Sequence, residues 1–237
     1  MNWEDANPGY WRQVPGWTDW GELYNEVAMT TPPGSVIVEV GVAFGRSLLY
    51  LAQKIKETGK DIQVCAVDRW TPYPEHHFIY DETAPVVESE RVAYECAKKH
   101  GGVFPAFIHH LNESGLADYV NVMRMDSIAA AQSFIASGIK PHFVFIDAEH
   151  EYEAVKKDLD AWWATGPEWI GGHDFSPKSE INFPGVWKSV FEKWPETKVK
   201  WQGSTCFVVR RSEIENGQPD GPYRYEYWKD GEVFKHQ

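Results

Sequence analysis

Four aspartates and a glycine turn occupy corresponding places in the sequence. Gly41, Asp68, Asp147 and Asp174 each stand at the end of a short apolar run, and Asp126 lies just past another. Ligands of an open parallel sheet bind beyond the carboxyl ends of its strands, so these residues would gather along one rim. A single aspartate often only caps a helix. Four of them in register favour a ligand site.

The turn at residues 39–45 (EVGVAFG) has the features of a nucleoside-binding loop. Gly41 permits a tight turn out of a strand, and Gly45 lets the next helix approach a ligand without a Cβ in the way, so that its first N–H groups face the ligand. Asp68, at the end of the second run, is placed to accept hydrogen bonds from the two hydroxyls of a ribose. The loop lacks the G-x-G-x-x-G spacing, and no Gly-Lys-Ser/Thr follows it, so a pyrophosphate ligand is disfavoured.

Two histidines accompany the aspartates of the second half. His150 comes three residues after Asp147, and His173 directly precedes Asp174. Imidazole titrates near neutral pH and can accept a proton from a substrate hydroxyl. We therefore expect His150 to be a general base, a role that His173 could share or exchange. The alternative for His150 is structural: an imidazole at a helix start, bonded to a neighbouring carboxylate.

The frame for these residues is an alternation of strand-like and helix-like segments, which is typical of a parallel sheet covered by helices. We expect an α/β, Rossmann-like, doubly wound and mostly parallel seven-stranded sheet with helices on both faces. The apolar β-branched runs predict strands, and apolar residues at helical spacing predict helices. The strands are expected at 35–40, 62–67, 120–125, 143–146 and 169–172, with a closing antiparallel pair at 198–201 and 205–210. The helices are expected at 47–55, 127–136, 151–163 and 186–194.

A single domain over residues 1–237 is the economical interpretation. It would comprise an N-terminal helical segment (1–33, with a helix near 17–29), an insertion at 69–117 and an extended polar tail from 211 to 237. The insertion holds helix-like stretches near 88–100 and 103–115, and we expect it to form the substrate side or lid of the cleft. Its paired histidines, at 76–77 and 109–110, are expected to be surface or lid residues.

The amino-acid composition of the chain disfavours some classes of partner. The formal net charge is −12, and no run of Lys and Arg exceeds a dipeptide, so a nucleic acid is disfavoured. No apolar run reaches the ~18 residues that a membrane span needs, and no signal peptide is recognisable, so we expect a cytoplasmic protein without a membrane partner. The three cysteines form no metal-type spacing and are expected to be reduced thiols. Aromatic residues in the N-terminal segment could mediate a homo-oligomer.

Three ordered motifs carry a family resemblance. The 39–45 loop, with Asp68 and the stretch 124–127 (RMDS), resembles class I S-adenosylmethionine (SAM)-dependent methyltransferases. The stretches FIDAEHEY (145–152), GGHDF (171–175) and PGV (184–186) resemble a branch near the macrolide-sugar and cephalosporin-biosynthesis O-methyltransferases, and more distantly catechol O-methyltransferase. The resemblance spans about residues 34–210. Residues 148–149 and 164–169 depart from its pattern.

The resemblance implies a SAM site and a divalent cation. The residues implied to bind SAM are Glu39, Gly41, Phe44, Gly45, Ser47, Asp68, Asp126, Ser127 and Asp147. Asp147 and Asp174 match the carboxylates that hold Mg²⁺ in metal-dependent relatives, where the ion binds the acceptor oxygen. His173 stands where catechol-type enzymes carry an aspartate, which weakens the Mg²⁺ case or admits a softer ion such as Mn²⁺.

The leading hypothesis is methyl transfer from SAM to a hydroxyl of a small molecule, assisted by a metal or by His150. Two alternatives stay open: methylation of a small amine, and a SAM-fold protein that binds without turnover, as a partner subunit.

Overall fold

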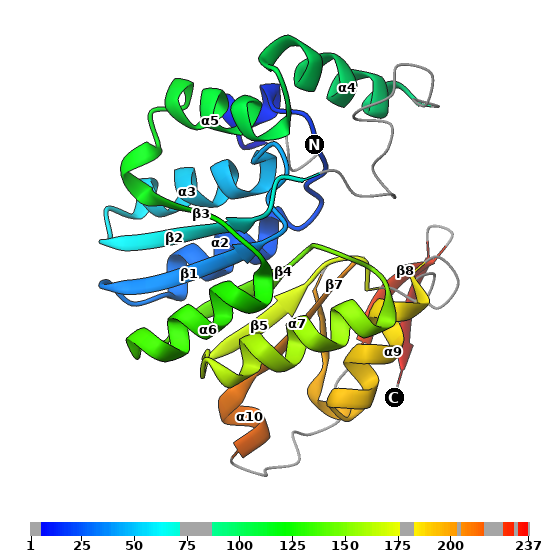
Figure 1. Cartoon of the computed structure of the whole chain (residues 1–237). Helices are drawn as coiled ribbons and strands as arrows, with labels where there is room; N and C mark the ends of the chain where they lie inside the picture. Colours follow the sequence, from blue (N-terminus) through cyan, green and yellow to red (C-terminus); the bar gives the residue numbers. More distant parts are fainter. Residues whose placement is uncertain are drawn as a thin grey trace. The chain divides into compact units, whose positions relative to one another are not determined.

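The computed structural model describes residues 6–71, 87–175, 183–202, 205–215, 225–229 and 232–236. Within these ranges a seven-stranded sheet has the order β3-β2-β1-β4-β5-β7-β6 (Figure 1). Its strands are β1 (Ser35–Val40), β2 (Ile62–Asp68), β3 (Val120–Arg124), β4 (Phe143–Ile146), β5 (Trp169–Gly172), β6 (Lys200–Gln202) and β7 (Cys206–Arg210). The pairs β2/β3, β1/β4 and β4/β5 are parallel, whereas β7 runs antiparallel to both β5 and β6. The predicted α/β fold with its mostly parallel sheet is confirmed.

The chain divides into two compact units, which we describe separately. The first comprises residues 1–35 and 41–126, and the second comprises residues 36–40 and 127–237.

In the first unit, helices surround β2 and β3. They are η1 (Tyr10–Gln13), α2 (Gly21–Thr30), α3 (Arg46–Thr58), α4 (Glu88–His100), α5 (Val103–Glu113) and η3 (Ala117–Tyr119). α3 packs against α2 and η1, and α4 packs against α5. The buried side of α3 is almost wholly apolar, because Leu48, Leu49, Leu51 and Ile55 are completely inaccessible. Both helices predicted in the 69–117 insertion are present. The first predicted helix begins at Gly21 rather than at Trp17, whose side chain is exposed.

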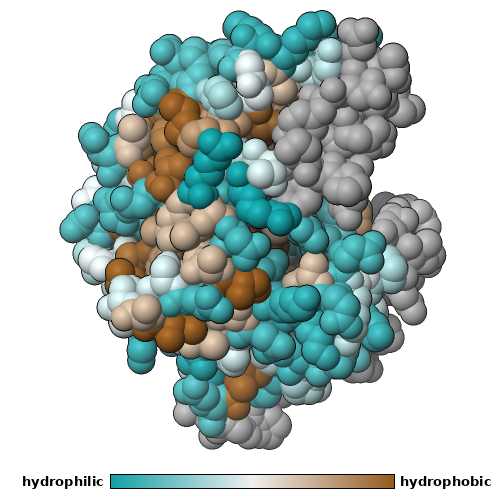
Figure 2. All heavy atoms as spheres, viewed as in Figure 1, coloured by the Kyte–Doolittle hydropathy of each residue, from teal (hydrophilic) through white to brown (hydrophobic). Residues whose placement is uncertain are grey.

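In the second unit, β1, β4, β5, β7 and β6 carry a core of apolar side chains, and α7 packs against both α6 and α9 (Figure 1). The helices are α6 (Ser127–Ser137), α7 (Tyr152–Ala164), α9 (Pro184–Lys193), η4 (Glu196–Lys198) and α10 (Arg211–Glu215). The amphipathic pattern of α7 places Val155, Leu159 and Trp162 in the core. The outward faces of α7 and α9 are mainly hydrophilic (Figure 2), as expected for helices that cover one side of a sheet.

The tail that was predicted to be extended from residue 211 begins instead with a helix, α10. The described residues further along are extended and form an antiparallel pair, β8 (Tyr225–Lys229) and β9 (Glu232–His236). Arg211 anchors the start of α10, because its guanidinium donates to the main-chain oxygens of Pro167 at 2.8 Å and Trp163 at 2.6 Å. No periodic pattern in the sequence indicates this anchor. No helix in the described ranges has the length and apolar character to cross a membrane.

Candidate functional site

The glycine loop of the first unit is held by a carboxylate. Asp68 ends β2, and its Oδ2 accepts hydrogen bonds from the backbone N–H groups of Val42 and Ala43, both at 2.9 Å. Its Oδ1 accepts a third bond from the N–H of Trp70 at 2.6 Å. A carboxylate offers about four acceptor positions, and these bonds occupy three of them. The residue predicted to bind a ribose therefore also fixes the main chain of the loop.

Trp70 lies against the same loop. Its indole Nε1 donates to the carbonyl of Ala43 at 2.8 Å, and its ring stacks on Phe107 of α5 with centroids 4.8 Å apart. Trp70 adopts a left-handed conformation with φ +50° and is almost fully buried. From the sequence alone, Trp70, Tyr73, Phe78 and Tyr80 suggest a lid over the substrate or, equally well, surface packing. The structure buries Trp70 against the glycine loop, and the other three residues lie outside the described ranges.

Gly45 is required by both its conformation and its neighbour. Its φ is +90°, and a Cβ at this position would lie 2.8 Å from the ring of Phe107. Gly41, with φ +86°, makes the turn out of β1, and its N–H donates to the carbonyl of Val67 at 2.9 Å. The insertion helix α5 thus packs directly on the loop, where only glycine allows so close an approach.

The N-terminal segment holds the other side of the loop. Arg46, the first residue of α3, donates through Nη1 to the carbonyl oxygens of Arg12 at 3.2 Å and Val14 at 2.9 Å. Its guanidinium lies 5.1 Å from the ring centroid of Trp11, which is completely buried. The start of α3 is therefore fixed by a segment more than thirty residues earlier in the chain.

His110 of the insertion was predicted to be a surface or lid residue, but its side chain is buried. Its Nδ1 lies 3.1 Å from the Tyr10 hydroxyl and its Nε2 lies 3.4 Å from Sγ of Cys96. Burial, followed by the charges of His109, His100 and nearby Lys99, lowers the pKa of His110 to about 4. The imidazole is thus neutral at physiological pH and links the N-terminal segment to α5. His76 and His77 lie outside the described residues.

The remaining residues predicted to bind cofactor fall in both units. In the first, Phe44 and Ser47 are buried at the start of α3, and Asp126 is exposed just past β3. In the second, Glu39 is buried in β1. The hydroxyl of Ser127 donates to Asp158 Oδ1 at 2.6 Å and accepts a bond from the indole of Trp162 at 2.9 Å. Ser127 therefore joins α6 to α7, an interaction that the sequence did not predict.

The second unit brings four predicted residues together. Nε2 of His150 lies 2.8 Å from Oδ2 of Asp174. Nδ1 of His173 lies 3.3 Å from the same oxygen and 3.4 Å from Oδ1 of Asp147. All four side chains are partly accessible. We call Asp147, His150, His173 and Asp174 the histidine–carboxylate cluster.

Asp174 is the centre of this cluster. Burial by itself raises the pKa of its carboxyl, but hydrogen bonds from His150 and His173, together with their charge, outweigh that effect. The net pKa is held well below its ordinary value, so Asp174 is a carboxylate at neutral pH. Its backbone is left-handed, with φ +56°. Such a conformation costs a non-glycine residue about 1–3 kcal/mol and recurs at functional sites.

Gly185 explains why the motif at 184–186 accompanies the cluster. A Cβ on Gly185 would lie 2.0 Å from the carbonyl oxygen of His150 and 2.6 Å from the backbone nitrogen of Tyr152. The first turn of α9 therefore rests directly on the main chain of His150. The ring of Phe183, just before α9, lies 4.6 Å from the imidazole, between centroids. The family motif is thus a packing requirement that positions His150.

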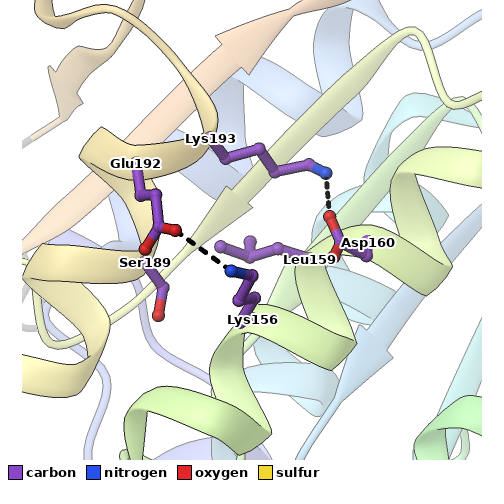
Figure 3. Close-up of a pocket in the computed structure, with 6 residues that line it drawn as sticks. All are labelled: Lys156, Leu159, Asp160, Ser189, Glu192 and Lys193. Carbon is purple, nitrogen blue, oxygen red and sulfur yellow. Dashed lines mark hydrogen bonds and ion pairs between the residues drawn. The ribbon is translucent and has the colours of Figure 1, made fainter.

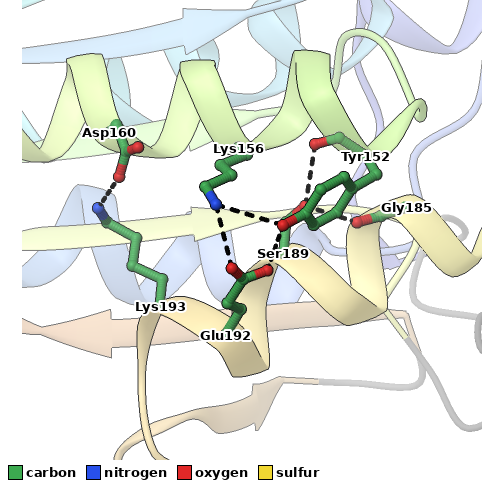
Figure 4. A network of polar contacts seen from close by, with 7 residues as sticks. All are labelled: Tyr152, Lys156, Asp160, Gly185, Ser189, Glu192 and Lys193. Atoms are coloured by element: carbon green, nitrogen blue, oxygen red, sulfur yellow. Dashed lines mark hydrogen bonds and ion pairs between the residues drawn. The ribbon is translucent and has the colours of Figure 1, made fainter.

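Polar contacts between α7 and α9 maintain this packing (Figure 4). The hydroxyl of Ser189 donates to the carbonyl oxygens of Gly185 at 2.7 Å and Tyr152 at 3.2 Å. Further along the helices, Lys156 donates to Glu192 at 3.0 Å and Lys193 pairs with Asp160. A shallow pocket opens here between the two helices (Figure 3). The charged side chains that line this pocket pair with one another across it. Such pairing is typical of contacts that hold two helices together rather than of a ligand site.

The three cysteines supply no nucleophile to either region. They are free thiols, and burial raises the pKa of Cys65 in β2 to about 11. The candidate chemistry therefore rests on the carboxylates and imidazoles.

Comparison with known proteins gives the class. Residues 38–168, more than half of the chain, match the model of a family described as a methyltransferase domain. The chain belongs to this family, and it is a class I SAM-dependent methyltransferase. A search of curated protein sequences finds no match.

Two solved structures illustrate the shared fold. Cofactor-bound Rv0187 from MTB superposes with a TM-score of 0.52 at 12% identity, over 83% of each chain. The O-methyltransferase NovP superposes with a TM-score of 0.52 at 13% identity, over 81% of this chain and 78% of the other. At these identities the likeness is one of fold.

Proposed function

We propose that this methyltransferase transfers the methyl group of SAM to a hydroxyl of a small molecule, with His150 as the general base. The 2.8 Å contact between Nε2 of His150 and Oδ2 of Asp174 carries the proposal. A carboxylate that accepts a hydrogen bond from Nε2–H selects the tautomer whose Nδ1 is basic, and it stabilises the imidazolium that forms.

The proposed reaction is an in-line displacement. The bond between the sulfonium sulfur and the methyl carbon breaks as the acceptor oxygen bonds to that carbon. The hydroxyl proton passes to Nδ1 of His150, and S-adenosylhomocysteine leaves as the neutral thioether. The protein contributes alignment of the two reactants and removal of the proton.

For SAM, we propose that Asp68 accepts a hydrogen bond from a ribose hydroxyl at the acceptor position that the three backbone N–H groups leave available. Gly41, Gly45 and the first turn of α3 would face the cofactor, with Asp126 near its base. Glu39, Phe44, Ser47, Ser127 and Asp147 complete the proposed set. The hydrogen bonds from Val42 and Ala43 to Asp68 support this assignment because they fix the main chain of the loop beside that carboxylate.

A divalent cation fits the cluster chemically. Asp147, His173 and Asp174 each offer one ligand atom, and these atoms lie within 4.8 Å of one another. An ion held there, Mg²⁺ or Mn²⁺, would lower the pKa of an acceptor hydroxyl. We also propose that the enzyme belongs to the branch that includes the macrolide-sugar and cephalosporin-biosynthesis O-methyltransferases, because its motifs at 145–152, 171–175 and 184–186 resemble that branch.

The test is a transfer assay with methyl-labelled SAM against matched sets of small hydroxylated and amino compounds. We expect label in the hydroxylated set and a fall in kcat of about 10²–10⁴-fold in His150→Gln, with SAM affinity unchanged. His142→Gln, at the opposite end of β4, is the matched control. Transfer only to amines would overturn O-methylation, and tight SAM binding with no transfer to either set would favour a binding protein.

A further inference from the structure

The spacing of the cluster atoms matches the first coordination shell of a small ion. Two ligand atoms that each lie about 2.1 Å from an ion, at right angles, are about 3.0 Å apart. Nδ1 of His173 lies 3.4 Å from Oδ1 of Asp147 and 3.3 Å from Oδ2 of Asp174. Shifts of a few tenths of an ångström would bring all three atoms onto one ion.

The backbone explains how two consecutive residues can contribute to that shell. Adjacent side chains of an extended strand point to opposite faces. β5 ends at Gly172, and the N–H of His173 still donates to the carbonyl of Ile146 at 3.1 Å, which continues the strand pairing. At Asp174 the chain turns into the left-handed region, with φ +56°. This turn accompanies the convergence of the His173 and Asp174 side chains.

We propose that His173 is a nitrogen ligand, so that the ion site is a carboxylate–imidazole–carboxylate set that selects Mn²⁺, Co²⁺ and similar first-row ions over Mg²⁺. This inference rests on the proposed function, because it specifies the ion of the same cluster. Magnesium prefers oxygen ligands in octahedral geometry, whereas imidazole favours transition ions. Two carboxylates supply the negative charge that a divalent ion requires, and the imidazole supplies the selectivity.

His150 is not the nitrogen ligand in this arrangement. Its Nε2 contacts Asp174, and it is absent from the set of atoms within 4.8 Å of one another. The carbonyl oxygen and main chain of His150 are also fixed by α9 at Gly185. The two histidines therefore have separate roles: His173 binds the ion, and His150 is the proposed general base.

The experiment measures metal binding directly on full-length protein without a polyhistidine tag. Calorimetric titrations with Mg²⁺, Mn²⁺ and Co²⁺ give the order of affinities, and pulsed electron paramagnetic resonance of the Mn²⁺ complex detects a coordinated nitrogen. We expect Mn²⁺ and Co²⁺ to bind at least about tenfold more tightly than Mg²⁺, with a clear nitrogen coupling. His173→Asp should remove the coupling and shift the preference towards Mg²⁺. The nitrogen coupling should persist in His150→Gln and in His142→Gln.

A label provides a readout that does not depend on a substitution at His173. Protein grown with ¹⁵N-histidine should show the coupling of ¹⁵N in place of ¹⁴N, while His150→Gln leaves that signal in place. A coupling that survives in His173→Asp, a coupling lost in His150→Gln, or equal affinity for Mg²⁺ would each overturn the inference.

Failure of the inference can be distinguished from failure of the proposed function. Protein that binds none of the three ions yet transfers methyl groups to hydroxyls in the presence of a chelator overturns the nitrogen-ligand inference and leaves O-methylation standing. Protein that binds Mn²⁺ through nitrogen but transfers no methyl group supports the inference and contradicts the function.

Discussion

The glycine loop and the histidine–carboxylate cluster are constructed from different parts of the chain. In the loop, a single carboxylate holds main-chain groups: Asp68 accepts hydrogen bonds from the N–H groups of Val42 and Ala43, and Gly45 admits the ring of Phe107. The cluster is held by side chains, with Asp174 contacted by two imidazoles. The loop presents mainly main-chain groups to a ligand, whereas the cluster presents titratable side chains. Substitutions in the two regions should therefore affect different steps.

The largest effect is expected for Asp174→Asn. The substitution preserves size but removes the negative charge that, in the proposed mechanism, selects the tautomer of His150 and stabilises its protonated form. We expect kcat to fall by about 10²–10⁴-fold, equivalent to about 3–5 kcal/mol in the barrier. Transfer assays under saturating SAM, with calorimetric SAM binding alongside, measure both quantities. If SAM affinity falls together with kcat, the cluster and the loop are not separable as we describe.

Gly185→Ala acts on the same region through packing. The new methyl group would collide with the carbonyl of His150, and backbone atoms cannot move aside as a flexible side chain can. We expect about 3 kcal/mol of destabilisation in urea unfolding, together with reduced turnover. Ser189→Ala is the milder companion, because it removes the bonds to Gly185 and Tyr152 without a clash. If both variants retain wild-type kcat, α9 does not position His150.

Gly45→Ala is the matched substitution at the loop. We expect the free energy of unfolding to fall by about 2 kcal/mol. The alanine would adopt a left-handed backbone and would crowd Phe107, whose ring can shift. The effect should appear in stability and in the Kd for SAM, with kcat at saturating SAM little changed. Gly59→Ala at the other end of α3 is a control, since it shares the left-handed conformation (φ +68°) but has no atom within 4 Å of the new Cβ. Equal loss of SAM affinity in both variants would contradict the role of Phe107.

The two regions also differ in what the sequence could reveal. β-branched runs predicted the strands to within a residue or two, and their ends placed Asp68, Asp147 and Asp174 correctly at strand termini. The sequence also associated His150 and His173 with those carboxylates. It could not show which pairs of these side chains meet, because the left-handed turn at Asp174 follows from packing and not from local propensity.

What was missed lies between segments distant in sequence. The bonds from Arg46 to Arg12 and Val14, the stacking of Trp70 on Phe107, and the contact of α9 with His150 join elements that no periodic pattern relates. Among these contacts, only those at glycines had a recognisable signal in the sequence. The PGV motif and Gly45 both mark places where another element approaches the backbone, although sequence reasoning explained Gly45 by a ligand alone.

Trp70→Phe should give the smallest effect and tests the least expected support of the loop. Phenylalanine retains most of the apolar ring that packs on Phe107, but it loses the indole N–H bond to Ala43. The Ala43 carbonyl would lose one partner, a cost of about 1 kcal/mol. We expect a similar fall in the free energy of unfolding and a several-fold weaker Kd for SAM, with kcat unchanged. Trp20→Phe offers a comparison in the same unit, because that indole is also buried but packs on Tyr24 rather than on the loop. A stability loss without any change in SAM affinity would mean that Trp70 supports the fold of the first unit but not the geometry of its loop.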